Sequence, residues 1–243
     1  MTSSFAVSEP GVCSSGSVLL ERLFDAVAHK SAHFISNIDP GWVDLAWRGL
    51  SADVPAQHGE HATRLASSAL QAVYEVRWPS LAALVLRVNR LAVLPLSQVL
   101  RVLHAVALYQ RRGDVRRCIG RNARLALVDA VGKPAFDVIV AAPGTDTRHE
   151  GEIRVDAVSL RVLERSAFQT LESRGVWQCT DARRLVSLCL APAASGVAAA
   201  PLDSAQPAAH FHRFIEQLDL LFPEHAWLFG CDMDKALSAS STA

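Results

Sequence analysis

Residues 95–107 read Pro-Leu-Ser-Gln-Val-Leu-Arg-Val-Leu-His-Ala-Val-Ala, a stretch in which apolar side chains recur every three or four residues. That spacing is typical of a helix that buries one face. The proline suits the first turn of a helix, and Gly113 is expected to end it. The positions of the apolar face are Leu96, Val99, Leu100, Leu103 and Ala107. The stretch therefore predicts a helix that packs in the core.

The same helical spacing recurs on both sides of this stretch, and alternating strand patterns are nearly absent. Further helices are expected at 18–38, 42–50, 62–73, 79–94, 114–132, 153–175, 180–190 and 211–222. Very short turns separate the helices expected between 79 and 132, which favours a compact antiparallel stack. Segment 134–142 fits a helix or a strand, and the candidates for strands are 137–141 and 152–155. The sequence predicts an all-α fold, a compact multi-helix domain with at most one short strand pair.

Changes in composition along the chain predict its domain organisation. Residues 1–16 show no periodicity and are expected to form a flexible N-terminal tail. A helical domain is expected at 17–190, followed by a linker or loop at 191–209 that is rich in Ala and Pro. A C-terminal helix at 210–230 is expected to dock on the body, and 231–243 to form a second flexible tail.

Overall composition excludes some classes of protein. Half of the 243 residues are hydrophobic and the mean hydropathy is +0.19, which excludes a disordered or fibrous chain. With 24 basic and 24 acidic residues the formal net charge is zero, so a dedicated nucleic-acid-binding protein is not favoured. No secretory signal is recognised, and the longest uncharged run, 185–202, is interrupted by prolines and a glycine. The five cysteines form no Cys-x-x-Cys pair. We expect a soluble cytoplasmic protein with reduced thiols and no transmembrane segment.

The sequence carries no common motif of an enzyme, a cofactor site or a metal site. The chain has no Gly-x-Ser-x-Gly, Walker, Gly-x-Gly-x-x-Gly or His-Glu-x-x-His motif. Four other candidates are read as surface or packing groups rather than as catalysts or ligands. They are the pair His58 and His61, the group His210, His212 and Glu216, and the single residues His104 and Cys118. The sequence therefore predicts a protein that is not an enzyme, with no cofactor, metal or small-molecule substrate.

Arginine is concentrated in one part of the chain. From Arg77 to Arg124 there are ten arginines and a single acid, Asp114, which is expected to cap a helix. Three interpretations stay open: a patch for an acidic protein or an anionic membrane face, a DNA contact by a helix-turn-helix-like turn at 111–124, and a solvated helix face. The DNA interpretation lacks a recognition helix rich in Asn, Gln and Ser.

Three stretches of the chain resemble a known family. They are Arg90-Leu-Ala-Val-Leu-Pro-Leu-Ser-Gln-Val-Leu-Arg-Val-Leu-His104, Arg111-Arg-Gly-Asp-Val-Arg-Arg-Cys-Ile119 and Gly132-Lys-Pro-Ala-Phe-Asp137. This pattern is similar to the SctK (YscK-like) accessory proteins of bacterial type III secretion, in particular the Hrp-type version of plant-associated bacteria. The segment Asp39-Pro-Gly-Trp42 resembles the N-terminal half of these proteins. The likeness covers roughly 80–142, and residues 143–243 match nothing in the pattern.

The resemblance implies a function in an assembly. Such proteins are non-enzymatic cytoplasmic adaptors of the sorting platform, associated peripherally with the inner membrane through the secretion machine. They link the cytosolic domain of the inner-membrane ring protein (SctD) to the pod protein (SctQ), which carries the stalk and the ATPase. Because Arg and Trp are frequent in interface hot spots, we expect two groups of contact residues. They are the arginines Arg111, Arg112, Arg116, Arg117 and Arg121, and the tryptophans Trp42 and Trp47, for which core packing is the alternative.

Overall fold

The computed structural model describes residues 16–48, 59–118, 120–143, 157–192 and 208–231. Within these residues every element is helical and no strand is present, so the all-α prediction is confirmed. The candidate strand at 137–141 is part of a helix, and the one at 152–155 lies outside the described residues, as does most of the expected linker at 191–209. No helix in the described ranges is both long and apolar enough to span a membrane.

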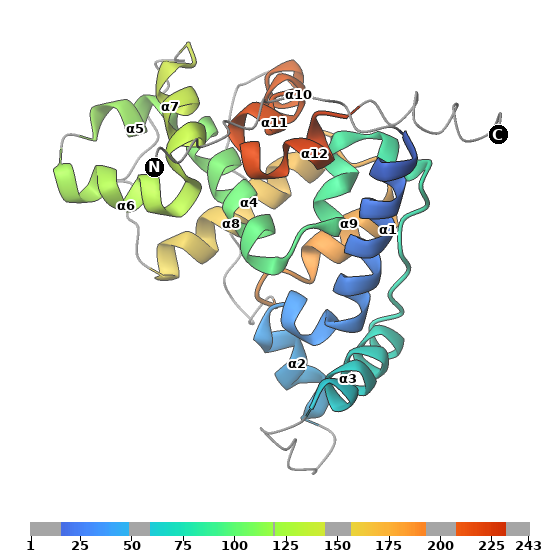
Figure 1. Ribbon diagram of the computed structural model, residues 1–243. Coiled ribbons are helices and arrows are strands. Elements are labelled where there is room, and N and C mark those ends of the chain that lie inside the picture. Colours follow the sequence, from blue (N-terminus) through green and yellow to red (C-terminus); the bar gives the residue numbers. More distant parts are fainter. Residues whose placement is uncertain (1–15, 49–58, 119, 144–156, 193–207, 232–243) are drawn as a thin grey trace, which may run out of the picture.

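The elements can be followed in chain order by their colour in Figure 1. The α-helices are α1 (Gly16–Ala32), α2 (Pro40–Trp47), α3 (Glu60–Val73), α4 (Leu96–Gln110), α5 (Arg112–Arg117), α6 (Arg121–Val131), α7 (Lys133–Ala141), α8 (Ala157–Ser173), α9 (Thr180–Ser187), α10 (Ala208–Glu216), α11 (Leu218–Leu221) and α12 (Ala226–Phe229). Short 3-10 helices are η1 (Phe34–Asn37), η2 (Ala83–Val85), η3 (Arg87–Val93) and η4 (Pro223–His225).

Helix α4 occupies the centre of the fold. It packs along α8 and also contacts α6 and α7 (Figure 1). Nearly all of its second half is buried, from Val102 to Gln110. Inside this packing the Nε2 atom of His104 lies 2.8 Å from Oε1 of Glu164 on α8. The buried surface of α4 is therefore wider than the predicted apolar face, because other helices surround α4 on most sides.

Segment 79–94 differs from the single α-helix predicted for it. It contains the two 3-10 helices η2 and η3, separated by Leu86 in an extended conformation. Every residue from Val88 to Val93 is buried, so this second half of the segment runs through the core, whereas Ser80, Ala82 and Leu86 in the first half are exposed. Helix α9 packs on one side of η3, and α1, α10 and α12 contact it as well.

Side chains explain why this segment does not continue as an α-helix. In an α-helix the carbonyls of Ala83, Leu84 and Val85 would each accept a hydrogen bond from an amide four residues later. Here Nδ2 of Asn89 donates to the carbonyl of Ala83 over 2.7 Å. The guanidinium of Arg90 donates to Leu84 through Nε over 2.7 Å and to Val85 through Nη2 over 2.8 Å. Side chains of Asn89 and Arg90 thus donate to the three carbonyls that backbone amides would occupy in an α-helix.

Three other predicted helices are each divided in two. The helix expected at 18–38 ends at Ala32 and is followed by η1, the helix expected at 114–132 becomes α5 and α6, and the helix expected at 211–222 becomes α10 and α11. At the first break Nδ1 of His33 lies 3.0 Å from the carbonyl oxygen of His29. Asp39 then caps α2, because its carboxylate accepts the amide of Gly41 over 2.8 Å.

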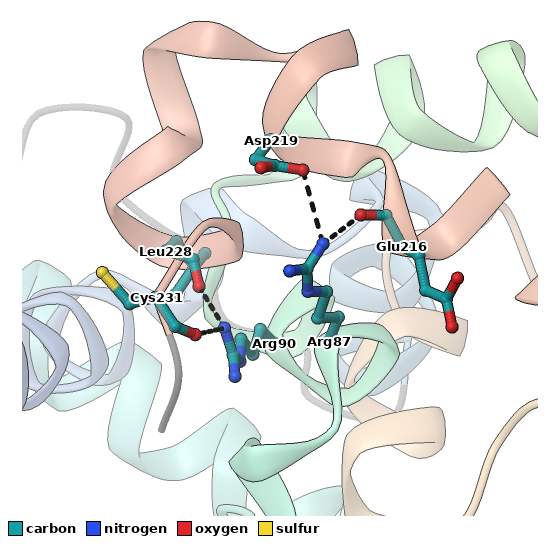
Figure 2. Close-up of polar contacts among 6 residues, drawn as sticks. All are labelled: Arg87, Arg90, Glu216, Asp219, Leu228 and Cys231. Carbon is teal, nitrogen blue, oxygen red and sulfur yellow. Dashed lines mark hydrogen bonds and ion pairs between the residues drawn. The ribbon is translucent and has the colours of Figure 1, made fainter. Parts of the chain in front are cut away.

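The C-terminal segment 208–231 packs on η3, α7 and α1, and its Phe214 ring meets the Tyr109 ring of α4 (Figure 1). Its aromatic side chains form an apolar contact with the body, and four of them are at most 1% exposed: Phe211, Phe214, Phe222 and Phe229. Two arginines of η3 add polar contacts to it (Figure 2). Nη1 of Arg90 donates to the carbonyls of Leu228 and Cys231 over 2.6 and 3.1 Å. Arg87 donates to the carbonyl of Glu216 and to Oδ1 of Asp219, the latter over 3.3 Å.

Candidate interaction surface

The predicted arginine group surrounds the short helix α5, which connects the central helix to α6. Asp114 was expected to cap the following helix, but it lies inside α5. Its carboxylate accepts Nε of Arg111 over 3.2 Å and Nη2 of Arg117 over 2.6 Å. Asp114, the single acid of this region, therefore connects the first turn of α5 to the last turn of the same helix. Gly120 is the residue directly before α6.

Arg112 is an internal arginine. Its side chain is only 2% exposed, and it donates through Nε to the carbonyl of Pro143 over 2.7 Å and through Nη1 to the carbonyl of Tyr109 over 3.0 Å. The guanidinium also lies 4.9 Å from the centre of the Tyr109 ring. Burial lowers the pKa of this guanidinium, Tyr109 raises it and Arg116 lowers it further, yet an arginine remains protonated at neutral pH. Arg112 thus joins the end of α4 to the end of α7.

The remaining arginines divide into supporting and outward-facing groups. Arg111 is mostly buried in its ion pair with Asp114. Arg116 is exposed, and its Nε donates to the carbonyl of Val140 over 2.8 Å, which connects α5 to α7. Arg117 keeps 48% of its side chain exposed, and Arg121 is exposed at the start of α6.

Two further residues complete this surface, and the sequence analysis did not include them among the contact residues. Arg124 is exposed one turn after Arg121, and its guanidinium lies 5.5 Å from the centre of the Phe136 ring. Leu125 beside it is 51% exposed. Arg124 and Leu125 follow Arg121 by three and four residues, and this spacing on one helix face could have identified both as surface neighbours of Arg121. We call Arg116, Arg117, Arg121 and Arg124, with Leu125, the basic surface; it lies on α5 and α6 at the left edge of Figure 1.

The two tryptophans lie on α2, far from the basic surface (Figure 1). Nε1 of Trp42 donates to the carbonyl of Leu190 over 2.8 Å, and its ring meets the Tyr74 ring edge-on at 5.6 Å. The hydroxyl of Tyr74 donates to the carbonyl of Trp42, and burial raises the pKa of this phenol. Trp47 is half-buried against the same core, and its Nε1 is buried without a hydrogen-bond partner among the described residues. A role of either tryptophan at an interface stays a prediction.

The other candidate groups occupy separate places. Cys118 is half-buried after α5, with a free thiol. His61 is exposed on α3, whereas His58 lies outside the described residues. His212 and Glu216 are both exposed on α10. In the described part of the chain these groups do not cluster with one another. The DNA interpretation of 111–124 stays a prediction.

Comparison with known protein families identifies a match. The model of the HrpB4 family, described as bacterial type III secretion protein (HrpB4), matches residues 23–224. The matched region begins within α1 and ends in η4, so it includes the basic surface and most of the segment packed on η3. No curated protein and no solved structure matches the chain.

Proposed function

The chain belongs to the HrpB4 family of bacterial type III secretion proteins, and on this premise we propose that it is an adaptor of the secretion machine's sorting platform. The proposed adaptor is a cytoplasmic, non-enzymatic protein held at the inner membrane by its partners. Those partners are a pod protein of the SctQ type and the cytosolic domain of a ring protein of the SctD type. Family membership supports the secretion role, and the resemblance of residues 90–137 to SctK-like proteins supports the adaptor role.

The observation that carries the contact site is the arrangement of the arginines around α5. Arg112 and Arg116 hold α5 against the ends of α4 and α7 through the contacts described above, and Arg111 pairs with Asp114 of α5. Arg117, Arg121 and Arg124 project from this support into solvent. A rigid support lowers the entropy lost when a partner orders these side chains. Because exposed positive charge accelerates and orients association with a negative surface, we propose that the basic surface binds an acidic patch of one platform partner.

Charge reversal tests this contact. The variant combines Arg117→Glu, Arg121→Glu and Arg124→Glu and leaves the internal Arg112 in place. We expect recovery of the pod or ring protein with the tagged variant to fall by about tenfold or more, as is usual when several interface charges are reversed. The measurement is affinity isolation from the native cell at low salt, with partners quantified by mass spectrometry, together with a secretion assay.

A matched control keeps the net charge change the same. It reverses three exposed arginines on other elements: Arg48, Arg77 and Arg161. Circular dichroism must show that both triple variants retain their helices. Undiminished recovery and secretion by the Arg117, Arg121 and Arg124 variant would contradict the contact site. Failure of the unchanged protein to recover any secretion component, in cells that express the machine, would contradict the adaptor itself.

A further inference from the structure

A cavity of about 530 Å³ lies between α1 and η1 on one side and η4 and α12 on the other. In Figure 1 helix α1 lies on the right side of the molecule and α12 nearer its centre, whereas the basic surface lies on the left. Its volume falls in the range of small-ligand sites. Basic and imidazole side chains are prominent in its lining: His29, Lys30, His33 and His225.

Lys30 brings a buried ammonium group to this cavity. The residue is 3% exposed, and among the described residues its Nζ has one hydrogen bond, to the carbonyl of Leu94. An ammonium group has three N–H donors, so two remain for another acceptor. Burial lowers the pKa of Lys30, and the nearby Cys189 partly opposes that effect. An acceptor that carries negative charge would relieve the cost of burying this group.

Three imidazole rings supply further donors. The rings of His29 and His33 stack with their centres 4.4 Å apart. Nδ1 of His33 donates to the carbonyl of His29, so Nε2 of His33 is left for another partner and becomes a donor in the imidazolium form of the ring. Nε2 of His225 is buried and has no hydrogen-bond partner among the described residues. A buried polar atom of this kind calls for a partner that the described chain does not provide.

The acid in the lining already has a cation. Oε1 of Glu224 lies 2.5 Å from Nη1 of Arg101, so this carboxylate does not compete for Lys30. The rest of the wall is largely apolar and includes Val93 and Trp227. Arg22 lies 4.4 Å above the centre of the Trp227 ring. The cavity thus combines unused N–H donors with an aromatic and aliphatic wall.

We propose that this cavity binds an oxyanion, a carboxylate or a phosphate, attached to an aromatic or aliphatic body. Lys30, His225 and the imidazolium form of His33 donate to the oxygens, and Val93 and Trp227 contact the body. The proposal does not depend on the adaptor function, because it rests on a different part of the molecule.

Three small probes test the proposal on the full chain. Phenyl phosphate and phenylacetate carry the two oxyanions, and benzyl alcohol carries the same ring without charge. NMR spectra of the histidine ring C–H groups follow the titration, with resonances assigned from single His→Gln variants. We expect saturable shifts of the His29, His33 and His225 signals with at least one anionic probe and none with benzyl alcohol. The better of the two anions tells whether the natural ligand is a carboxylate or a phosphate.

Variants separate the cavity from a general effect of charge. Lys30→Gln and His33→Gln should each weaken binding of the better probe about tenfold, the usual effect of losing one charge-assisted hydrogen bond. His33 is only half-buried, so its variant keeps the test valid if Lys30→Gln unfolds. His61→Gln, at an exposed position on α3, is the control and should leave the affinity unchanged. Absence of saturable shifts, equal binding of benzyl alcohol, or equal weakening by His61→Gln would overturn the proposal.

Discussion

The arginines of η3 and those of the basic surface lie in the same arginine-rich part of the chain but have opposite environments. Arg90 on η3 is 2% exposed and donates to four backbone carbonyls, two of them in the C-terminal segment (Figure 2). Arg121 on α6 is exposed to solvent. The first arginine connects parts of the fold, and the second leaves its charge available to a partner.

The difference shows what decides the role of an arginine in this protein. A guanidinium has five N–H donors, so it can satisfy several carbonyls at once where helices are interrupted. Segment 83–94 and the end of the C-terminal segment provide such carbonyls around Arg90. Arg121 lies at the start of α6, where the carbonyls accept amides of the same helix and none is left for its guanidinium. Interrupted helices therefore bury arginines, whereas a regular helix at the edge of the fold exposes them.

The largest expected effect comes from removing the buried guanidinium. Arg90→Met keeps much of the side-chain volume but leaves the carbonyls of Leu84, Val85, Leu228 and Cys231 without this donor. We expect the free energy of unfolding to fall by about 3 kcal/mol or more, as for other buried charged networks that lose one partner. Chemical denaturation followed by circular dichroism measures this loss. Arg121→Met is the matched control on the basic surface; if both variants lost stability equally, the contrast between the regions would be wrong.

A second prediction concerns Arg101 of α4, which lies in an environment between these two. Its Nε donates to the carbonyl of Val131 over 3.0 Å, beside Gly132, whose φ is +86°. A Cβ at Gly132 would collide with the Arg101 guanidinium and would also force a backbone conformation that favours glycine. Gly132→Ala should therefore lower the free energy of unfolding by about 2 kcal/mol in denaturant titrations.

The control for that change is Gly59→Ala, because a Cβ at Gly59 would meet no atom within 4 Å and its φ is not positive. If Gly132→Ala were as stable as Gly59→Ala, Arg101 could move aside freely. It would then belong with the exposed arginines rather than with the connecting ones.

The smallest effect is expected at Arg87, which is partly exposed. Its ion pair with Asp219 has side chains that are 31% and 27% exposed, so solvent weakens it. Arg87→Gln should cost about 1 kcal/mol, mainly by loosening α10 and α11. Hydrogen exchange should show faster exchange in residues 211–222 and unchanged protection in α4 and α8. Uniformly faster exchange in all helices would instead make Arg87 a global contact like Arg90.

Much of the fold could be predicted from periodicity because α4, α8 and α9 bury one continuous apolar face. Periodicity failed at 79–94, where Asn89 and Arg90 replace the backbone donors. It also failed at 114–132, because Cys118 and Gly120 are extended and Asp114 pairs with Arg111 and Arg117. Both failures depend on side-chain contacts, and apolar spacing carries no information about them.

The candidate site was predictable only in part for a similar reason. The concentration of arginines located the region, and Arg117 and Arg121 are exposed there. Adjacent residues in the turn had the same appearance in the sequence, yet Arg112 is buried against Pro143 and Tyr109. Which of two neighbouring arginines faces inward depends on where α7 ends, and this is a property of the folded chain. The cavity beside Lys30 involves residues from 26 to 228 and had no local signal.

The contact of Arg90 with Leu228 joins residues 138 positions apart. During synthesis segment 83–94 leaves the ribosome long before residues 208–231 exist, so its core position stays open until the last helices arrive. A chain cut short before α10 would expose both η3 and the central helix to water. Proteases and chaperones recognise such exposed apolar surface, so an incomplete chain would be removed before it could occupy a place in the secretion machine.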